Sequence, residues 1–125
     1  MPSLYLSPST QEGNPYITGG SEEYYMNLLA DELVPYLGAN AIPYTRNTPD
    51  MTAVSSVAQA NAGCYDLYLA LHSNAAGPSS SGQVRGVLAF YYPTSANGLL
   101  YALEQLPVQS GTRMPMVLNV ACRTV

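Results

Sequence analysis

The one histidine of this 125-residue chain stands at the end of an apolar segment. The segment runs from Asp66 to Leu71, His72 follows it, and the small polar residues Ser73 and Asn74 come directly after. Apolar side chains on both faces are typical of a central parallel strand that is covered by helices on each side. Open parallel sheets bind ligands beyond the carboxyl ends of their strands. His72 is therefore the first residue that we expect to carry chemistry.

Two adjacent carboxylates are the second candidates. Glu22 and Glu23 follow Ser21, a good N-cap residue, and the apolar spacing after them predicts a helix to about Leu37. The amino ends of helices and the carboxyl ends of parallel strands share one edge of a sheet, so we expect these carboxylates, the segment 7–11 and His72 to meet. A carboxylate that faces a histidine is half of a zinc site.

The remaining pattern predicts the elements that position these groups. Strands are expected at 3–7, 42–45, 66–72, 84–92 and 116–121, and helices at 22–37, 51–62 and 95–106. This alternation predicts a layered α/β domain with a mainly parallel central sheet flanked by helices, and one domain over residues 1–125. The expected inward side chains are Tyr25, Leu28, Leu29, Leu33, Tyr36 and Leu37 of the first helix, and Val54, Val57 and Ala58 of the second, which Asp50 would cap.

The charge balance excludes some partners. The chain has four arginines and no lysine against eight carboxylates, a net charge of −4, which argues against nucleic acid and anionic membranes. No apolar run is long enough to span a membrane, and the amino terminus lacks the pattern of a secretory signal, which predicts synthesis in the cytoplasm. Cys64 and Cys122 lack metal-ligand spacing and are expected to be two separate buried thiols, with a disulfide between them as the alternative. We expect a monomer.

Several short motifs occur together in register over about the first ninety residues. They are Leu6 to Gln11, Glu23 before Asn27-Leu28, Thr45-Arg46, Ala60-Asn61, and Asp66-Leu67 followed by His72-Ser73-Asn74-Ala75. In this order and spacing the chain resembles the zinc-dependent N-acetylmuramoyl-L-alanine amidases, the cell-wall hydrolases of bacterial autolysins and phage endolysins.

The resemblance implies a site, a cofactor and a substrate. Glu23 and His72 would bind one zinc ion, with Gln11 or Glu12 as a candidate third ligand, and Asn74 and Ala75 would shape the loop that contacts substrate. Zinc-activated water would cleave the amide between the lactyl group of N-acetylmuramic acid and L-alanine. The partner would be peptidoglycan or a muropeptide, met at the cell wall after release or lysis.

The chain departs from the family pattern at three places. Thr10 or Gln11 stands where the family has its first histidine ligand, the last strand has no glutamate near Asn119 and Val120, and the segment from Tyr92 to Met116 is short. The catalytic residue therefore stays unassigned, and the domain is expected to be shortened in its C-terminal part. Two alternatives stay open: an inactive or truncated member that keeps the fold and peptidoglycan binding, and a small α/β domain in which His72 is structural.

Overall fold

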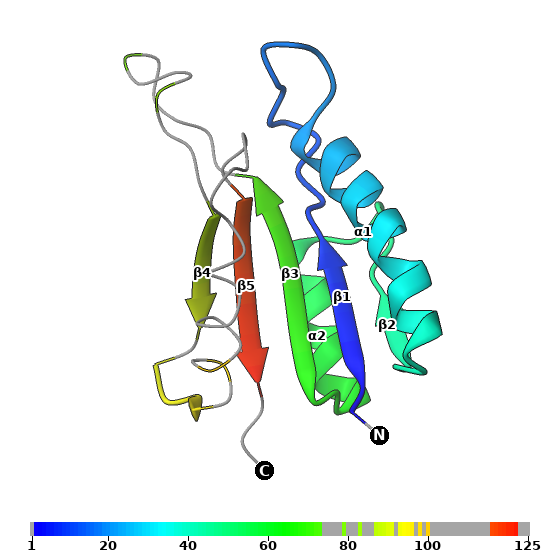
Figure 1. Ribbon diagram of the computed structural model, residues 1–125. Helices are drawn as coiled ribbons and strands as arrows, with labels where there is room; N and C mark the ends of the chain where they lie inside the picture. Colours follow the sequence, from blue (N-terminus) through cyan, green and yellow to red (C-terminus); the bar gives the residue numbers. More distant parts are fainter. Residues whose placement is uncertain are drawn as a thin grey trace.

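The computed structural model describes residues 2–73, 79, 83, 87–91, 93–96, 98, 100 and 116–122, with only the backbone for 87, 88 and 116–122. Its strands are β1 (Leu4–Pro8), β2 (Tyr44–Arg46), β3 (Leu67–Ser73), β4 (Val87–Tyr91) and β5 (Met116–Cys122), and its helices are α1 (Glu22–Ala39) and α2 (Ala53–Gly63). The strands form one sheet in the order β2-β1-β3-β5-β4 (Figure 1).

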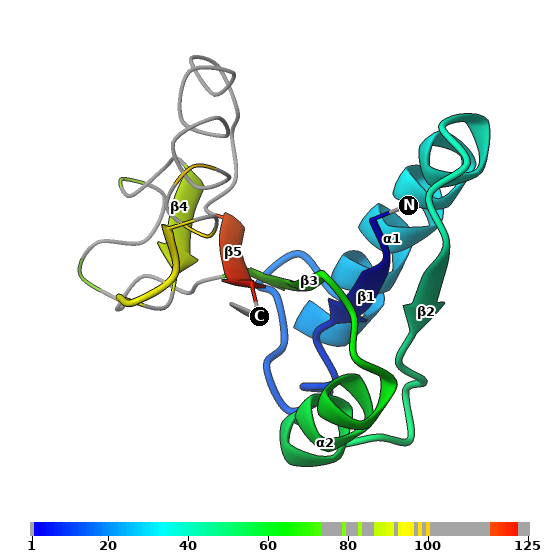
Figure 2. The ribbon, with the colours of Figure 1, turned by 90° about the horizontal axis from the view of Figure 1, so that it is seen from below.

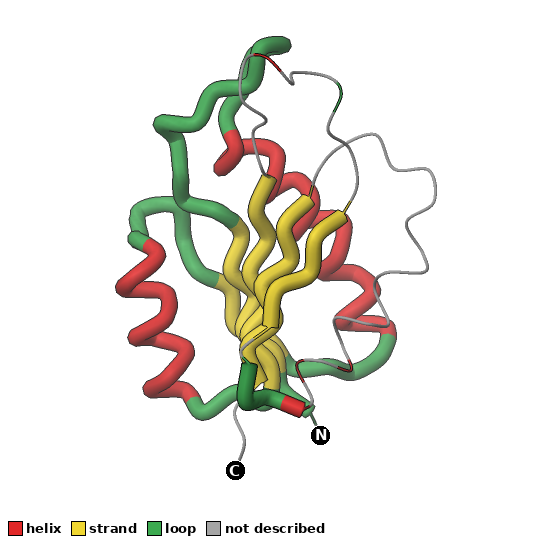
Figure 3. Tube along the Cα trace, turned by 90° about the vertical axis from the view of Figure 1, so that its left-hand side faces the viewer, coloured by secondary structure: helices red, strands yellow, loops and turns green. Residues whose placement is uncertain are grey.

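The sheet is mainly parallel and lies between the two helices. Strand β1 pairs in parallel with β2 and β3, and β4 pairs in parallel with β5. Helix α1 covers one face and α2 covers the other (Figures 2 and 3). The expected layered α/β fold is therefore confirmed. Among the described residues, no helix is both long enough and apolar enough to cross a membrane.

Leucine side chains form the core under α1. Leu4, Leu6 and Leu71 of the sheet pack with three residues of the helix, Met26, Ala30 and Leu37, and Tyr25, Leu29 and Leu33 lie at the border of this cluster. The predicted stripe was wrong at Leu28 and Tyr36, which are 44% and 67% exposed. The buried line of α1 starts instead at Glu22 and continues through Met26 and Ala30 at four-residue spacing. The face of α1 that packs on the sheet determines which of the two adjacent glutamates, Glu22 or Glu23, points at the sheet.

Tyrosines fill the opposite face, under α2. Tyr5 and Tyr68 stack with their ring centroids 5.4 Å apart. Their hydroxyl groups donate to Gln59 Oε1 at 2.6 Å and to Ser7 Oγ at 2.9 Å, and burial raises the pKa of both tyrosines. These rings leave room only for small side chains of the helix, so the buried residues of α2 are Ser56 and Ala60.

The prediction for the inward face of α2 was therefore wrong. Val54 and Val57 are 80% and 46% exposed, and Ala58 is also exposed. The N-cap is Thr52 rather than Asp50, because its hydroxyl accepts from the Ser55 backbone N–H while the Ser55 hydroxyl accepts in return from the Thr52 N–H.

Strand β5 runs antiparallel to β3, which the sequence pattern did not predict. Val117 lies opposite His72, whereas Asn119 and Val120 lie opposite Ala70 and Leu69. The amino end of β5 thus lies beside the carboxyl end of β3. The helix predicted at 95–106 falls mostly outside the described residues. Cys64, expected to be buried, is exposed at the end of α2.

Asn47, a buried residue in the segment after β2, makes hydrogen bonds to both β1 and α2. Its side-chain amide donates to the Pro8 carbonyl at 3.0 Å, to Ser56 Oγ at 3.1 Å and to Ser7 Oγ at 3.3 Å, and the residue is 4% exposed. The contacts join the end of β1, the segment after β2 and helix α2. Buried polar groups that lose such a partner carry their full desolvation cost.

We predict that Asn47→Ala lowers the free energy of unfolding by about 2 kcal/mol, because the Pro8 carbonyl and the Ser56 hydroxyl lose their donor. The midpoint of urea unfolding measures this change. Asn61→Ala, at an exposed position of α2, is the matched control and should stay within about 0.5 kcal/mol of wild type. Equal midpoints for the two variants would contradict the role given to Asn47.

Hydrogen bonds to the Asp66 side chain connect the start of β3 to the amino end of β1. Its Oδ2 accepts from the Ser3 backbone N–H at 2.7 Å and from the Ser3 hydroxyl at 2.9 Å. These bonds hold the pKa of Asp66 below its ordinary value of 3.8. A lowered pKa in the folded state means that the ionised carboxylate stabilises the fold above the ordinary value.

We predict that Asp66→Ala lowers the melting temperature at pH 7, and that the difference from wild type shrinks as the pH falls below 3.8 and through the lowered folded-state pKa. Thermal unfolding followed by circular dichroism across pH 2 to 7 measures this on both proteins. A difference that does not change with pH would exclude the ionised carboxylate as its source.

Candidate functional site

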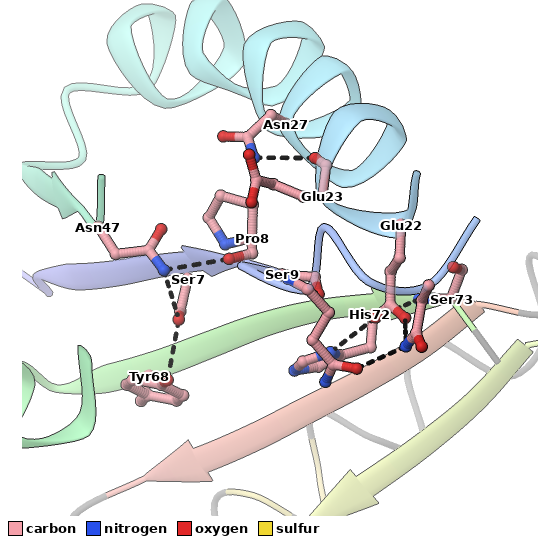
Figure 4. A network of polar contacts seen from close by, with 12 residues as sticks. Ser7, Pro8, Ser9, Glu22, Glu23, Asn27, Asn47, Tyr68, His72 and Ser73 are labelled. Carbon is pink, nitrogen blue, oxygen red and sulfur yellow. Dashed lines mark hydrogen bonds and ion pairs between the residues drawn. The ribbon is translucent and has the colours of Figure 1, made fainter. Parts of the chain in front are cut away.

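The candidate site lies at the carboxyl ends of β1 and β3, beside the amino end of α1 (Figure 4). His72 Nδ1 lies 3.0 Å from Glu22 Oε1, and the Ser73 backbone N–H donates to the same oxygen at 3.3 Å. The Glu22 side chain is 5% exposed and that of His72 is 26% exposed. The site thus has a buried carboxylate and an imidazole that solvent can reach.

The start of α1 determines how Glu22 is placed. Ser21 has an extended backbone, and its hydroxyl accepts from the Tyr24 N–H at 3.1 Å, so the helix begins at Glu22. Glu22 is the first residue of the buried line that continues with Met26. Its charge also lies at the positive end of the helix dipole, which favours a carboxylate there.

The loop after β1 supplies the other partners of Glu22. The Asn14 side-chain amide donates to Glu22 Oε2 at 3.0 Å and to Gln11 Oε1 at 2.5 Å, and the Asn14 carbonyl accepts from the Glu22 N–H at 2.9 Å. The Gln11 backbone N–H donates to Ser9 Oγ at 3.2 Å. Gln11 thus belongs to the same network as Glu22 and His72, with Asn14 between them.

The side-chain oxygen and nitrogen atoms of this network meet only some of the requirements of a zinc site. Two atoms bound to one tetrahedral zinc lie about 3.3 Å apart, close to the 3.0 Å between Glu22 Oε1 and His72 Nδ1. Gln11 Oε1 is a further side-chain oxygen of the network, joined to Glu22 through Asn14, and an amide oxygen is a weaker zinc ligand than histidine. Within the described part of the chain, no group of three histidine, cysteine, aspartate or glutamate residues could hold a metal.

The pair can also act with Glu22 outside the metal's coordination sphere. A neutral His72 that donates its Nδ1–H to Glu22 keeps the Nε2 lone pair for a metal, and carboxylates commonly orient metal-binding histidines in this way. Glu22 is a ligand in the first arrangement and an orienting partner in the second. In both, His72 is the nitrogen ligand.

Glu23, the predicted ligand, lies elsewhere. Figure 4 shows it apart from His72, its backbone carbonyl accepts from the Asn27 side-chain amide at 2.9 Å, and its Oε2 is buried without a hydrogen-bond partner among the described residues. The structure brings Glu22, not Glu23, to His72. The spacing of Glu22 to Met26 and Ala30 was the signal in the sequence, but the stripe that we predicted was built on Tyr25 and Leu28 instead.

The other residues singled out in the sequence fall into three groups. Asn74 and Ala75 lie outside the described residues. Asn119 and Val120 belong to β5 and lie further along the sheet than the strand end that carries His72. Arg46 is structural, because its guanidinium donates to Asn27 Oδ1 at 2.7 Å and to Asp31 Oδ1 at 2.6 Å, which ties β2 to α1.

We predict that Glu22→Gln weakens zinc binding at pH 7 and that Glu23→Gln does not, since only Glu22 contacts His72. A loss of more than about 100-fold would make Glu22 a ligand, whereas about 10- to 100-fold would fit an orienting partner. Competition with a chromogenic chelator on metal-stripped protein gives both affinities. Loss of zinc in Glu23→Gln alone would instead support the ligand implied by the sequence resemblance.

Comparisons with known proteins give no relative for this chain. No protein-family model matches it, and no curated protein or solved structure gives a significant match.

Proposed function

We propose that this chain is a divergent peptidoglycan hydrolase of the zinc-dependent N-acetylmuramoyl-L-alanine amidase type. The observation that carries the proposal is the buried Glu22 carboxylate held against His72 at the carboxyl end of β3. This is the edge at which α/β proteins place their ligands. The register of motifs from Leu6 to Ala75 supports the same family.

Glu22 and His72 would hold one zinc ion, and Gln11 Oε1 is the candidate for a third contact. Zinc bound there supplies a Lewis acid that makes a water molecule nucleophilic near neutral pH. The Ser73 N–H and the Asn14 amide each donate to one oxygen of Glu22, so the carboxylate keeps a fixed orientation toward His72. The bond to be cleaved joins the lactyl carbonyl of N-acetylmuramic acid to the nitrogen of L-alanine.

Cleavage of that amide needs a group that carries a proton to the leaving nitrogen. Among the described residues, Glu22 is the carboxylate in contact with His72, and its oxygens already accept from His72, Ser73 and Asn14. A missing proton carrier costs about 100- to 10,000-fold in rate. The proposal therefore implies a slow enzyme.

A second candidate function is peptidoglycan binding without hydrolysis. Two observations favour it: an amide, Gln11, stands in the network in place of a third strong ligand, and β5 carries Val117 opposite His72 rather than a carboxylate. A family member that lost catalysis would keep the fold and its contact with the wall.

We predict that the zinc-loaded protein releases new L-alanine amino termini from purified peptidoglycan, slowly and in a way that EDTA and His72→Ala abolish. Gln11→His should raise this rate at least about 10-fold, because it adds a strong ligand within the same network. Amino-terminal labelling of the soluble products measures the release.

Two other outcomes separate the alternatives. Zinc binding and sedimentation with peptidoglycan without any release of amino termini, also in Gln11→His, would select the non-catalytic family member. If neither zinc nor peptidoglycan binds, the proposal is wrong and His72 is a structural residue.

A further inference from the structure

The loop between β1 and α1 contains a fixed turn next to the candidate site. Pro15 and Ser21 form an antiparallel bridge, the Tyr16 N–H donates to the Gly20 carbonyl at 2.9 Å, and the Gly19 N–H donates to the Tyr16 carbonyl at 3.0 Å. Gly19 and Gly20 have φ values of 93° and 81°, which side-chain-bearing residues rarely adopt. The turn therefore has a defined shape, and Figure 1 shows this loop extending past the carboxyl ends of β1 and β3.

Two tyrosines of α1, Tyr24 and Tyr25, pack against this turn, and Tyr16 belongs to the turn itself. The ring of Tyr25 lies edge-on to those of Tyr16 and Tyr24, with centroids 4.8 and 5.1 Å apart, and its hydroxyl donates to the Gly19 carbonyl at 3.1 Å. A Cβ atom at Gly20 would come within 2.8 Å of the Tyr25 ring. The lack of a side chain at Gly20 thus permits both the positive φ of the turn and the close packing of the Tyr25 ring. The Tyr25 ring in turn packs against one side of the Tyr24 ring.

Large apolar surface stays exposed on this support. Tyr24 is 55% exposed and Ile17, in the turn, is 93% exposed. We call Ile17, Tyr24 and the turn Pro15–Gly20 the tyrosine platform. A supported, exposed aromatic ring loses little conformational entropy when a ligand stacks on it.

The charges around the platform indicate what kind of ligand it fits. No charged residue occurs from Gly13 to Ser21, whereas Glu12, Glu22 and Glu23 flank this segment. Carboxylates of a peptide stem would be repelled there, but the glycan of peptidoglycan is neutral because its lactyl carboxyl group is bound in an amide. The turn is joined to the start of α1, since the Asn14 carbonyl accepts from the Glu22 N–H at 2.9 Å.

We infer that the tyrosine platform binds a neutral, N-acetylated sugar strand, with Tyr24 stacking on a sugar ring and Ile17 covering its neighbour. The inference rests on the proposed function to the extent that peptidoglycan is the source of the sugar chain. Because the platform contains none of the candidate metal ligands, its binding is independent of zinc.

The test is a titration of the full chain with the β-1,4-linked tetramer of N-acetylglucosamine, in EDTA, followed by NMR chemical shifts. We expect millimolar or tighter binding, with Tyr24→Ala weakening it at least about 10-fold, which is about 1.4 kcal/mol. Tyr36→Ala is the matched control, because Tyr36 is an exposed tyrosine near the other end of α1. Far-UV circular dichroism checks that both variants are folded.

Each other outcome contradicts a stated part. No binding of the tetramer, or equal affinity for wild type and Tyr24→Ala, overturns the platform, whatever the zinc experiments show. Tetramer binding without zinc binding leaves the platform standing and removes the proposed hydrolase. A dimer in light scattering that Ile17→Ser dissociates, with no sugar binding, would make this surface a contact between copies of the chain.

Discussion

Burial of one carboxylate constrains the arrangement of the whole carboxyl edge. An ionised side chain away from water is costly unless hydrogen bonds replace its hydration. Glu22 receives them from three directions: the Ser73 N–H and His72 from β3, the Asn14 amide from the loop, and the amino end of α1 itself. Helix, loop and strand are held in register by this one group. Without the Glu22 carboxylate, the Ser73 N–H and the Asn14 amide would lose the oxygens to which they donate.

The same group shows what the sequence could place: it predicted that His72 and the two adjacent glutamates share one edge of the sheet, but the resemblance named Glu23, whereas Glu22 contacts His72. The end of β3 and the start of α1 follow from local signals, namely an apolar run that stops at His72 and a serine N-cap at Ser21. Which of two adjacent glutamates faces the sheet depends on the rotation of the helix. That rotation is fixed by Met26 and Ala30 against leucines of β1, a tertiary contact that periodicity only suggests.

The wrong predictions for α2 and β5 also concern tertiary contacts that local sequence patterns do not determine. The pattern placed the strands well, because apolar runs rich in leucine, valine and aromatic residues are local features. It placed Val54 and Val57 inward because they are the most apolar residues of α2, yet the Tyr5 and Tyr68 rings admit only Ser56 and Ala60. The antiparallel direction of β5 relative to β3 is a pairing between segments far apart in the sequence, which the local pattern of 116–121 does not determine.

The position of β5 between β3 and β4 has a consequence for the order in which the protein folds on the ribosome. Strands β2, β1 and β3 with both helices are complete once Ser73 has emerged, but the partner of β3 on its other side begins only at Met116. Until then the nascent chain presents the open edge of β3, whose sequence Leu67 to Leu71 is apolar and uncharged. Such edges pair readily with other chains. Until β5 has been synthesised, the open edge of β3 can pair with other chains and lead to aggregation. The yield of folded protein should therefore depend on temperature and on chaperones more strongly than expected for so small a protein.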